Sequence, residues 1–415
     1  MTRSGLPPAE AAALILAAVN PMPVERVPLM TALGAFLAEN VFAVATVPPW
    51  RSASMDGYAV RAADIDILPA SLRVIGETVA GAAVAQQLAA GQAVKIMTGA
   101  PVPQGADTVV RVEDTTAAGG SVQILGGRDR LRNVRPLGED FRNGDLLVRA
   151  GTRITPAAIG VLASTGVSSV AVRRAPTVSI VSSGDELVRV DEFAQVVAGE
   201  RIVSSNSYSL PALVRDAGGT PRDGGITADD PTALRAAIDA AIGSDLLLTS
   251  GGVSVGDRDF TRRVMSDMGA DIKFWRARVR PGGPIAFGTL HGRPWIGLPG
   301  NPVSAMVTFE LFVRPAILKM LGEDSCFPMS HPVVLDEPVT VSGDLTHYLR
   351  VVVSAGDAGM HVRLTGTQSS AALTSMMRAN ALLIVPEGRR EYLAGETLRA
   401  IPLGCAHYRT ATFPS

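Results

Sequence analysis

The spacing of hydrophobic and polar positions changes along the chain and divides it into regions of different predicted structure. Residues 8–19 are rich in alanine and place Leu14, Ile15 and Val19 at helical spacing before two prolines, which predicts a short helix. From about residue 44 to residue 145, short apolar runs alternate with Gly, Pro and Asp. This texture is typical of a small β-rich domain.

Between about residues 177 and 321 the pattern alternates between strands and helices. The runs TVSIV and DLLLTS have the length and composition of buried strands. Two expected helices begin near Asn206 and Pro231, and a third follows DLLLTS and ends at Gly269. This alternation predicts a doubly wound α/β domain. After Pro328 the β-type runs return, which predicts a small C-terminal β-domain.

Composition and charge narrow the possible functions. With 415 residues and 47% hydrophobic content, the chain is long enough for two to four domains with filled cores. Lys and Arg (38) balance Asp and Glu (39), so the net charge of -1 favours neither nucleic acid nor an anionic membrane as partner. The two cysteines and five histidines lack metal-ligand spacing, and no signal-peptide pattern opens the chain, so we expect a soluble cytoplasmic protein.

Two strand-end loops place carboxylates beside glycines. DLLLTSGGVSVGDRDF contains paired glycines followed by Asp257 and Asp259, and SIVSSGDELV places Asp185 and Glu186 directly after a glycine. Because parallel strands present their carboxyl ends at one edge, both loops should lie on the same rim. Backbone N–H groups suit phosphate, whereas clustered carboxylates repel it unless a hard cation lies between. Together with Asp229, these acids indicate magnesium bridging the protein and a phosphorylated ligand; the alternative is that each aspartate only caps a helix.

Several common nucleotide and hydrolase motifs do not occur in the sequence. No Walker Lys follows the glycines, and G-x-G-x-x-G and H-E-x-x-H are missing. An ordinary P-loop ATPase, a dinucleotide redox enzyme and a zincin are therefore disfavoured.

Two further stretches carry chemistry that suits an anion. RARVRPGGP places Arg276, Arg278 and Arg280 at alternate positions, so on a strand they would share one face suited to an oxyanion. The alternative is a solvated edge strand. GLPGNPVSAMVTFE predicts a turn at Asn301 and a helix that begins close to Ser304.

Several blocks of the sequence, taken together, resemble the molybdopterin molybdenumtransferase family, to which the gephyrin E-domain belongs. In the family's order they are SASMDGYAV, KIMTGAPVPQGADTVVRVED, VRPLGEDFRNGD, SSGDEL with SNS, SGGVSVGD, RPGGPIAFG with GLPGNPVSA, and TGTQSSAALTSMMRANALLIVPEG. The resemblance covers essentially the whole chain. It implies that adenylylated molybdopterin and molybdate are converted to molybdenum cofactor and AMP with a divalent cation, Mg²⁺, assisting. It also implies a homodimer with a cleft shared between two chains, and molybdopterin adenylyltransferase and apo-molybdoenzymes as partners.

The fold implied in this way is multidomain, of the α/β plus β class. A doubly wound α/β molybdopterin-binding domain is flanked by an N-terminal β-rich domain and a C-terminal small β-barrel-like domain. The expected boundaries are residues 1–45 with 141–176 for a discontinuous N-terminal helical and linker domain, 46–140 for the inserted β-rich domain, 177–327 for the α/β domain, and 328–415 for the C-terminal domain.

The resemblance also implies roles for individual residues. The catalytic set is Asp56, Thr98, Asp140, Glu186, Asp229 and Asp259. Of these, Glu186, Asp229 and Asp259 would bind the metal. The substrate-binding set is Ser183, Gly184, Asp185, Asn206, Ser250, Gly251, Gly252, Ser254, Gly256, Asp257, Arg276, Arg280, Pro299, Gly300, Asn301, Ser304, Arg350, Ser369 and Ser370. Molybdate contacts fall on Ser304, Arg350 and either Ser369 or Ser370.

The chain departs from the family pattern in its cations. Where the family usually has lysines, as in K-P-G-K-P, this sequence has Arg276, Arg280 and Gly283, and Ala371 stands where some members carry Arg. A non-catalytic pterin-binding or scaffold paralogue therefore stays open. A molybdopterin adenylyltransferase, whose family shares the α/β fold with the acidic glycine loop, is a second alternative, which the flanking β-domains disfavour. The sequence also leaves open molybdate versus tungstate, the physiological partners and paralogue redundancy.

Overall fold

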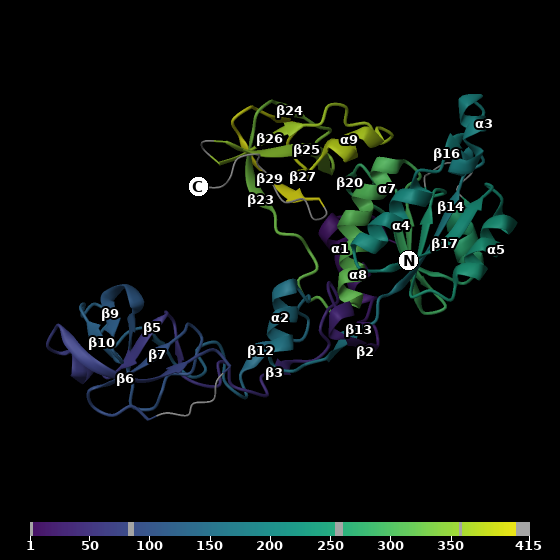
Figure 1. Ribbon diagram of the computed structural model, residues 1–415. Helices are drawn as coiled ribbons and strands as arrows, with labels where there is room; N and C mark the ends of the chain where they lie inside the picture. The colour runs from purple at the N-terminus through teal and green to yellow at the C-terminus, as the bar shows by residue number, and fades with distance from the viewer. Residues whose placement is uncertain (1–2, 82–86, 254–259, 357–358, 404–415) are drawn as a thin grey trace.

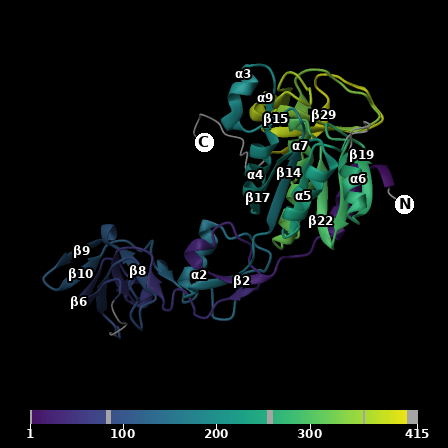
Figure 2. The same cartoon turned by 90° about the vertical axis from the view of Figure 1, so that its right-hand side faces the viewer.

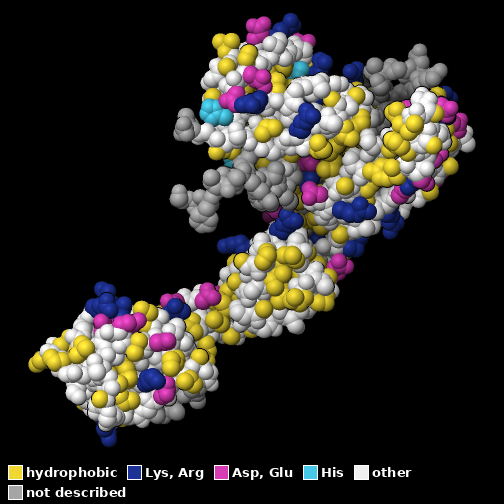
Figure 3. Space-filling model, turned by 45° about the horizontal axis from the view of Figure 1, so that its top comes forward, with side chains coloured by type: hydrophobic (Ala, Val, Ile, Leu, Met, Phe, Trp, Pro, Cys, Tyr) yellow, Lys and Arg dark blue, Asp and Glu magenta, His cyan; other side chains and the backbone are white. Residues whose placement is uncertain are grey.

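The chain folds into four parts: a β-rich lobe, a middle part, an α/β part and a C-terminal barrel (Figure 1). A computed structural model describes residues 3–81, 87–253, 260–356 and 359–403. Figures 1 and 2 show a β-rich lobe at one end, a small middle part with α2, and an α/β part joined to a β-barrel at the other end. On the face in Figure 3, basic and acidic side chains are interspersed. No helix in the described part of the chain is long and apolar enough to cross a membrane.

A seven-stranded sheet forms the centre of the α/β part. In spatial order its strands are β1 (Arg3–Leu6), β19 (Asp271–Ala277), β21 (Ala286–Leu290), β22 (Arg293–Leu298), β18 (Leu246–Ser250), β14 (Thr177–Ser183) and β17 (Thr220–Thr227). All pairings are parallel except those of β21, which runs antiparallel to β19 and β22. β18 is buried along its whole length, as its uninterrupted apolar run predicts.

Helices cover both faces of this sheet, which confirms the predicted doubly wound α/β fold. One face packs against α1 (Pro8–Ala17), α4 (Asn206–Asp216), α7 (Pro302–Thr308) and α8 (Arg314–Met320). The other face packs against α5 (Pro231–Ala241) and α6 (Phe260–Asp267). Trp295 lies in this second core, fully buried, and its Nε1–H donates to Thr249 at 3.0 Å. Burial of each such large side chain contributes roughly 2 to 3 kcal/mol.

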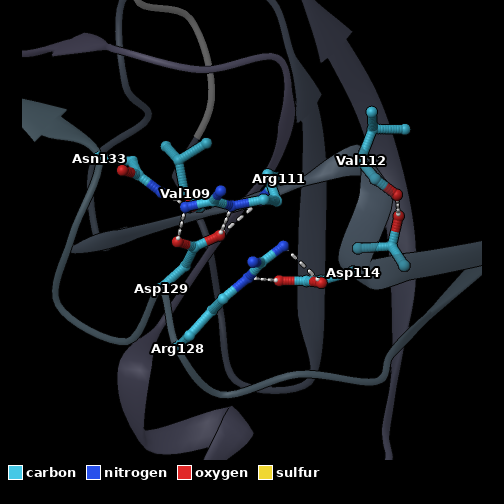
Figure 4. Close-up of polar contacts among 8 residues, drawn as sticks. Val109, Arg111, Val112, Asp114, Arg128, Asp129 and Asn133 are labelled. Atoms are coloured by element: carbon cyan, nitrogen blue, oxygen red, sulfur yellow. Dashed lines mark hydrogen bonds and ion pairs between the residues drawn. The ribbon is translucent and has the colours of Figure 1, made fainter.

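The β-rich lobe is built on one six-stranded sheet. Its strands are, in order, β8 (Thr108–Arg111), β5 (Gly57–Val60), β7 (Gln92–Ile96), β6 (Ala70–Thr78), β10 (Ser121–Ile124) and β9 (Thr115–Ala118). Figure 4 shows how a loop is tied to β8: Asp129, which is 1% exposed, accepts from Arg111 at 2.8 and 2.9 Å. Beside it, Asn133 donates to the Val109 carbonyl at 2.9 Å. A buried carboxylate is thus fully paired.

The middle part consists of short strand pairs around one helix. These are β2 (Val24–Pro28) with β13 (Ser169–Arg173), β3 (Val41–Phe42) with β12 (Leu146–Val148), and α2 (Pro156–Ser164); a further pair, β4 (Ser52–Ala53) with β11 (Val134–Arg135), packs into the core of the lobe instead. The Thr155 side chain caps α2 by accepting from the Ala158 N–H at 3.2 Å. A separate apolar core that includes Leu37, Ile154 and Leu162 holds these elements together.

The C-terminal part is a closed barrel, as expected. Its strands are β25 (Thr346–Gly356), β26 (Gly359–Leu364), β23 (His331–Leu335), β29 (Thr397–Pro402) and β27 (Ala381–Val385), with β27 pairing back to β25. β24 (Val339–Thr340), β28 (Glu391–Tyr392) and α9 (Leu373–Arg378) complete this part. The short strand β20 (Val279–Arg280) comes directly after β19 in the chain and pairs with β25 of the barrel. Backbone hydrogen bonds therefore connect the α/β part to the barrel.

Candidate functional site

A first cavity of about 580 Å³ lies at the carboxyl ends of β14, β18 and β22, which are neighbours in the sheet. β18 and β17, the two neighbours of β14 in the sheet, both come later in the chain than β14. The strand order therefore reverses at β14, and open α/β sheets bind their ligands at such a reversal. Eleven of the predicted residues line it: Ser183, Gly184, Glu186, Asn206, Asp229, Ser250, Gly251, Gly252, Pro299, Gly300 and Asn301.

Two glycines allow the ends of β14 and β18 to approach each other. Gly251 has a φ of +98°, and a Cβ there would lie 2.5 Å from the Ser183 carbonyl oxygen. Gly252 has a φ of +63°, and its Cβ would lie 2.2 Å from Thr261 Oγ1 on α6. Any side chain at either position would collide and strain the backbone. In the described residues the two loops share one rim, as the sequence predicted.

Asn206, at the start of α4, ties this rim together. It is buried, and its Nδ2 donates to Ser250 Oγ and to the Gly300 carbonyl oxygen, both at 2.8 Å. Because the Gly300 carbonyl oxygen can only accept a hydrogen bond, the Asn206 atom that faces it must be Nδ2 and not Oδ1. Asn206 Oδ1 has no hydrogen-bond partner among the described residues. The side chain therefore acts mainly by positioning the turns that follow β18 and β22.

The carboxylates near this cavity fall into different roles. Glu186 and Asp229 line it, whereas Asp185 lines a neighbouring depression and accepts from the Asp229 backbone N–H at 3.0 Å. Asp230 is the N-cap of α5 and accepts from Ala233 at 2.8 Å, so Asp229 is not that cap. Ser254, Gly256, Asp257 and Asp259 were predicted here and lie outside the described residues.

A second cavity, of about 670 Å³, lies between the α/β part and the barrel. Seven predicted residues line it: Arg276, Arg280, Asn301, Ser304, Arg350, Ser369 and Ser370. Pro284 and Asn301 also line the first cavity, so the two cavities adjoin. Of the described residues that line the second cavity, none is Asp or Glu.

The expectation that three alternate arginines share one strand face is wrong. Arg276 has a φ of 87°, in the left-handed region, which interrupts the regular alternation at the end of β19. Arg278 donates instead to Glu387 at 3.1 Å. Only Arg276 and Arg280 reach the second cavity, and in the described part of the chain neither has an ion-pair partner.

Arg350, on β25, is the most buried cation of the second cavity. It is 0% exposed; its Nε donates to Ser375 Oγ at 3.1 Å and its Nη2 to the Ser369 carbonyl at 2.9 Å, while Nη1 has no partner among the described residues. Burial lowers the pKa of Arg350 to about 10, so the side chain stays charged at neutral pH. Without a counter-charge in the wall, the cavity suits an oxyanion.

The remaining predicted residues lie far from both cavities in the same chain. Asp56, in the β-rich lobe, accepts from the Thr98 backbone N–H at 2.7 Å and from its hydroxyl at 2.8 Å, and these two bonds lower the pKa of Asp56. Asp140 lies between the lobe and the middle part, where its N–H donates to Val47. Figures 1 and 2 place the lobe at the opposite end of the molecule from the α/β part.

Sequence reasoning missed several lining residues. His347 and Gln368 line the second cavity, and Gln368 holds Arg350 by accepting from its backbone N–H at 2.9 Å and donating to its carbonyl at 3.0 Å. Leu187 and Ile202 line the first cavity from a small excursion made of β15 (Leu187–Val188), α3 (Phe193–Val197) and β16 (Ile202–Val203). Of these, Gln368 and Leu187 carried a signal, because they belong to the quoted blocks TGTQSSAALTSMMRANALLIVPEG and SSGDEL.

Comparison with known proteins gives a consistent result over most of the chain. Residues 6–166 match the MoeA N-terminal region (domain I and II), residues 179–319 the probable molybdopterin binding domain, and residues 332–403 the MoeA C-terminal region (domain IV). The molybdopterin molybdenumtransferase of Bacillus subtilis is 35% identical over 91% of this chain and 89% of its own. That of Haemophilus influenzae is 32% identical over 92% and 94%. The crystal structure of the molybdopterin biosynthesis moeA protein from Pyrococcus horikoshii OT3 superposes with a TM-score of 0.82 at 27% identity, covering 96% of this chain and 100% of that one.

Proposed function

The chain belongs to the molybdopterin molybdenumtransferase family, and on that premise we propose which substrates and residues carry its reaction. It is a transferase that inserts molybdenum in molybdenum cofactor biosynthesis. The proposed substrates are adenylylated molybdopterin and molybdate, and the products are molybdenum cofactor and AMP. The proposed setting is a cytoplasmic homodimer that receives the pterin from molybdopterin adenylyltransferase and supplies apo-molybdoenzymes.

One observation carries this proposal: two cavities of opposite character adjoin at Pro284 and Asn301. The first cavity is lined by the glycine turn after β18 and by two carboxylates, which suits a phosphorylated ligand held with a cation. The second offers three arginines and no acid within the described residues, which suits an oxyanion. A pterin bound in the first cavity would meet molybdate bound in the second.

The donor set of the first cavity fits a hard divalent cation. Glu186 and Asp229 supply carboxylate oxygens from two strand ends, although the described residues contain no cluster of three potential ligands. Mg²⁺ keeps several waters and needs only one or two carboxylates beside substrate phosphates. We propose that Glu186 and Asp229 hold it, together with Asp259. When bound, it would neutralise charge on the phosphoanhydride that is cleaved.

The chain's own residues would then position both reactants. Arg276 and Arg280, unpaired in the described structure, are available to bind molybdate oxygens, and Ser304 on α7 supplies a hydroxyl to the same cavity. Arg350 holds the segment that carries Ser369 by donating to its carbonyl. The glycine turn after β18 would hold the phosphate end of the adenylylated pterin close to Pro284 and Asn301, which line both cavities. AMP would then leave beside the bound molybdate.

The proposed homodimer explains the distance of Asp56 and Thr98 from the cavities. Because the β-rich lobe and the α/β part lie at opposite ends of one chain, these residues contribute to catalysis only if a second chain presents its lobe to the cleft. Asp140, between the lobe and the middle part, would be supplied in the same way.

The direct test is to incubate the protein with adenylylated molybdopterin, Mg²⁺ and molybdate. We expect AMP release that depends on both ions, and reconstitution of an apo-molybdoenzyme by the product. Omission of molybdate serves as the control. Tight binding of the adenylylated pterin without AMP release or reconstitution would instead favour a scaffold paralogue.

A further inference from the structure

A histidine that the proposed mechanism does not use lies in the wall of the second cavity. His347, on β25, is 5% exposed and pairs in register with Arg280 on β20. Its Nε2 is 2.9 Å from Ser342 Oγ. Its Nδ1 forms no hydrogen bond with any described residue. One ring nitrogen is therefore anchored, and the other is available.

Burial and the surrounding charges both favour the neutral form of His347 while no anion is present. On the elements packed around it, or in the same cavity wall, they are Arg276, Arg278, Arg280, Asp344, Arg350, Glu387 and Arg390. The two acids each face an arginine, Glu387 at 3.1 Å from Arg278 and Asp344 at 3.9 Å from Arg390. Burial, and after it the charge of Arg280, lowers the pKa of His347.

A bound oxyanion shifts this electrostatic balance towards the protonated imidazole. A dianion among Arg276, Arg280 and Arg350 offsets their positive charge and adds a negative charge to the same wall as the imidazole. An opposite charge within a few ångströms favours the protonated ring. The protonated imidazole has two N–H donors, so Nε2–H donates to Ser342 and Nδ1–H is left to donate to the anion.

We propose that His347 is a further oxyanion-binding residue of the second cavity, and that it takes up one proton from solvent as the anion binds. This inference rests on the proposed function, in which that cavity holds molybdate. The proton goes to whichever ring nitrogen lacks one, and no other bond is made or broken. Oxyanion binding and proton uptake are then reciprocally linked.

The test is the pH dependence of molybdate affinity, measured by titration calorimetry on the full-length protein. Between about pH 8 and pH 6, we expect the dissociation constant to fall with decreasing pH by a factor that approaches tenfold per unit, the limit for one linked proton. In His347→Gln, which keeps a group able to bond Ser342, we expect a change of less than about twofold over the same range. The protonation of molybdate itself affects both proteins equally and cancels in the comparison.

His361→Gln is the matched control. His361 lies on β26, and its Nδ1 is 2.9 Å from Asp336 rather than in the cavity wall. This variant should retain the full pH dependence. The same slope in His347→Gln as in the wild type would overturn the inference.

A second measurement does not depend on the folding of a variant. In protein with labelled histidine side chains, saturating molybdate should move the titration of one imidazole, assigned to His347, to higher pH. An unshifted titration in protein that binds molybdate would also overturn the inference while leaving the proposed function intact. Failure of molybdate to bind at any pH would overturn both.

Discussion

At the scale of single residues, two buried charged side chains differ in whether they have a partner of opposite charge. Asp129, in the β-rich lobe, accepts hydrogen bonds from both the backbone and the side chain of Arg111. Arg350 is equally buried, yet one guanidinium nitrogen has no partner among the described residues, and no described wall residue is acidic. Removal of Asp129 would leave the Arg111 guanidinium without its partner, which predicts a loss of stability, whereas a buried cation without a counter-charge is a candidate for anion binding.

We expect Asp129→Asn to destabilise the β-rich lobe. The hydrogen bond from Arg111 holds the pKa of Asp129 at about 2, well below its ordinary value. A depressed pKa contributes stability above the ordinary pKa and loses it as pH falls towards the folded value, so the cost should be about 2 kcal/mol at neutral pH and should shrink below about pH 4. Hydrogen exchange of β8 at neutral pH and at about pH 3 measures this.

Asp66→Asn is the matched control for this prediction. Asp66 pairs with Arg130 in the same lobe at 2.7 Å, but the pair is exposed. Its loss should cost less than about 1 kcal/mol. Equal costs for the two variants would mean that burial of Asp129 does not determine its contribution.

Gly283→Lys should strengthen molybdate binding. Gly282, not Gly283, has a left-handed φ, of +101°, so a side chain at Gly283 is not strained in this way. Its Cβ would lie 3.1 Å from the Val279 carbonyl, a tight contact that predicts a small loss of thermal stability. A new ammonium in the second cavity should tighten the affinity for molybdate by about 1 to 2 kcal/mol.

The neighbouring glycine is the control. Gly282→Ala, whose Cβ would lie 2.3 Å from Thr308, should instead destabilise the protein. Unchanged affinity in a stable Gly283→Lys protein would exclude this position as a molybdate contact.

At the scale of elements, the two glycines directly after β18, Gly251 and Gly252, leave no room for a side chain. Gly252→Ala places a methyl group 2.2 Å from Thr261 Oγ1 at a φ of +63°, so we expect a stability loss of about 1 to 3 kcal/mol and weaker binding of the adenylylated pterin. Gly160→Ala is the control, because its Cβ meets nothing within 4 Å in α2 and should be neutral or stabilising. Thermal unfolding and pterin titration of both variants decide the point. Unimpaired pterin binding by Gly252→Ala would contradict the role given to this turn.

The sequence predicted most elements but not their pairing. Local spacing and turn residues predicted α1, α4, β18 and the end of α6 at Gly269, and the structure confirms them. The face of Arg276 was mispredicted because a left-handed φ is not visible in an alternating pattern. His347 was missed because it enters the wall through long-range pairing of β20 with β25. Contacts between distant segments depend on tertiary register, which local periodicity does not encode. The domain boundaries and the roles of the site residues stay predictions.

At the scale of the whole molecule, the separation of Asp56 from Glu186 makes a dimer testable by mixing variants. We expect Asp56→Ala and Glu186→Ala chains to be inactive alone and to regain about a quarter of wild-type AMP release when co-folded. Half of the dimers would then be mixed, each with one intact site. A mixture of Glu186→Ala with Asp229→Ala should stay inactive, because both changes lie in the same part of the chain. Equal recovery in both mixtures, or in neither, would contradict a site shared between chains.

The central claim is that the arginine-lined second cavity binds the oxyanion beside the pterin. It is tested most directly by comparing the molybdate dependence of AMP release in Arg280→Ala and Arg278→Ala, two changes of the same kind two positions apart. Arg280 lines the cavity without an ion-pair partner in the described chain, whereas Arg278 pairs with Glu387 outside it. We predict that Arg280→Ala raises the KM for molybdate by about tenfold or more, equivalent to one charge-assisted hydrogen bond, with little change in the KM for adenylylated molybdopterin. Arg278→Ala should stay within about twofold of the wild type for both substrates, as expected for an exposed pair. An unchanged KM for molybdate in Arg280→Ala, or an equal rise in both variants, would contradict the account.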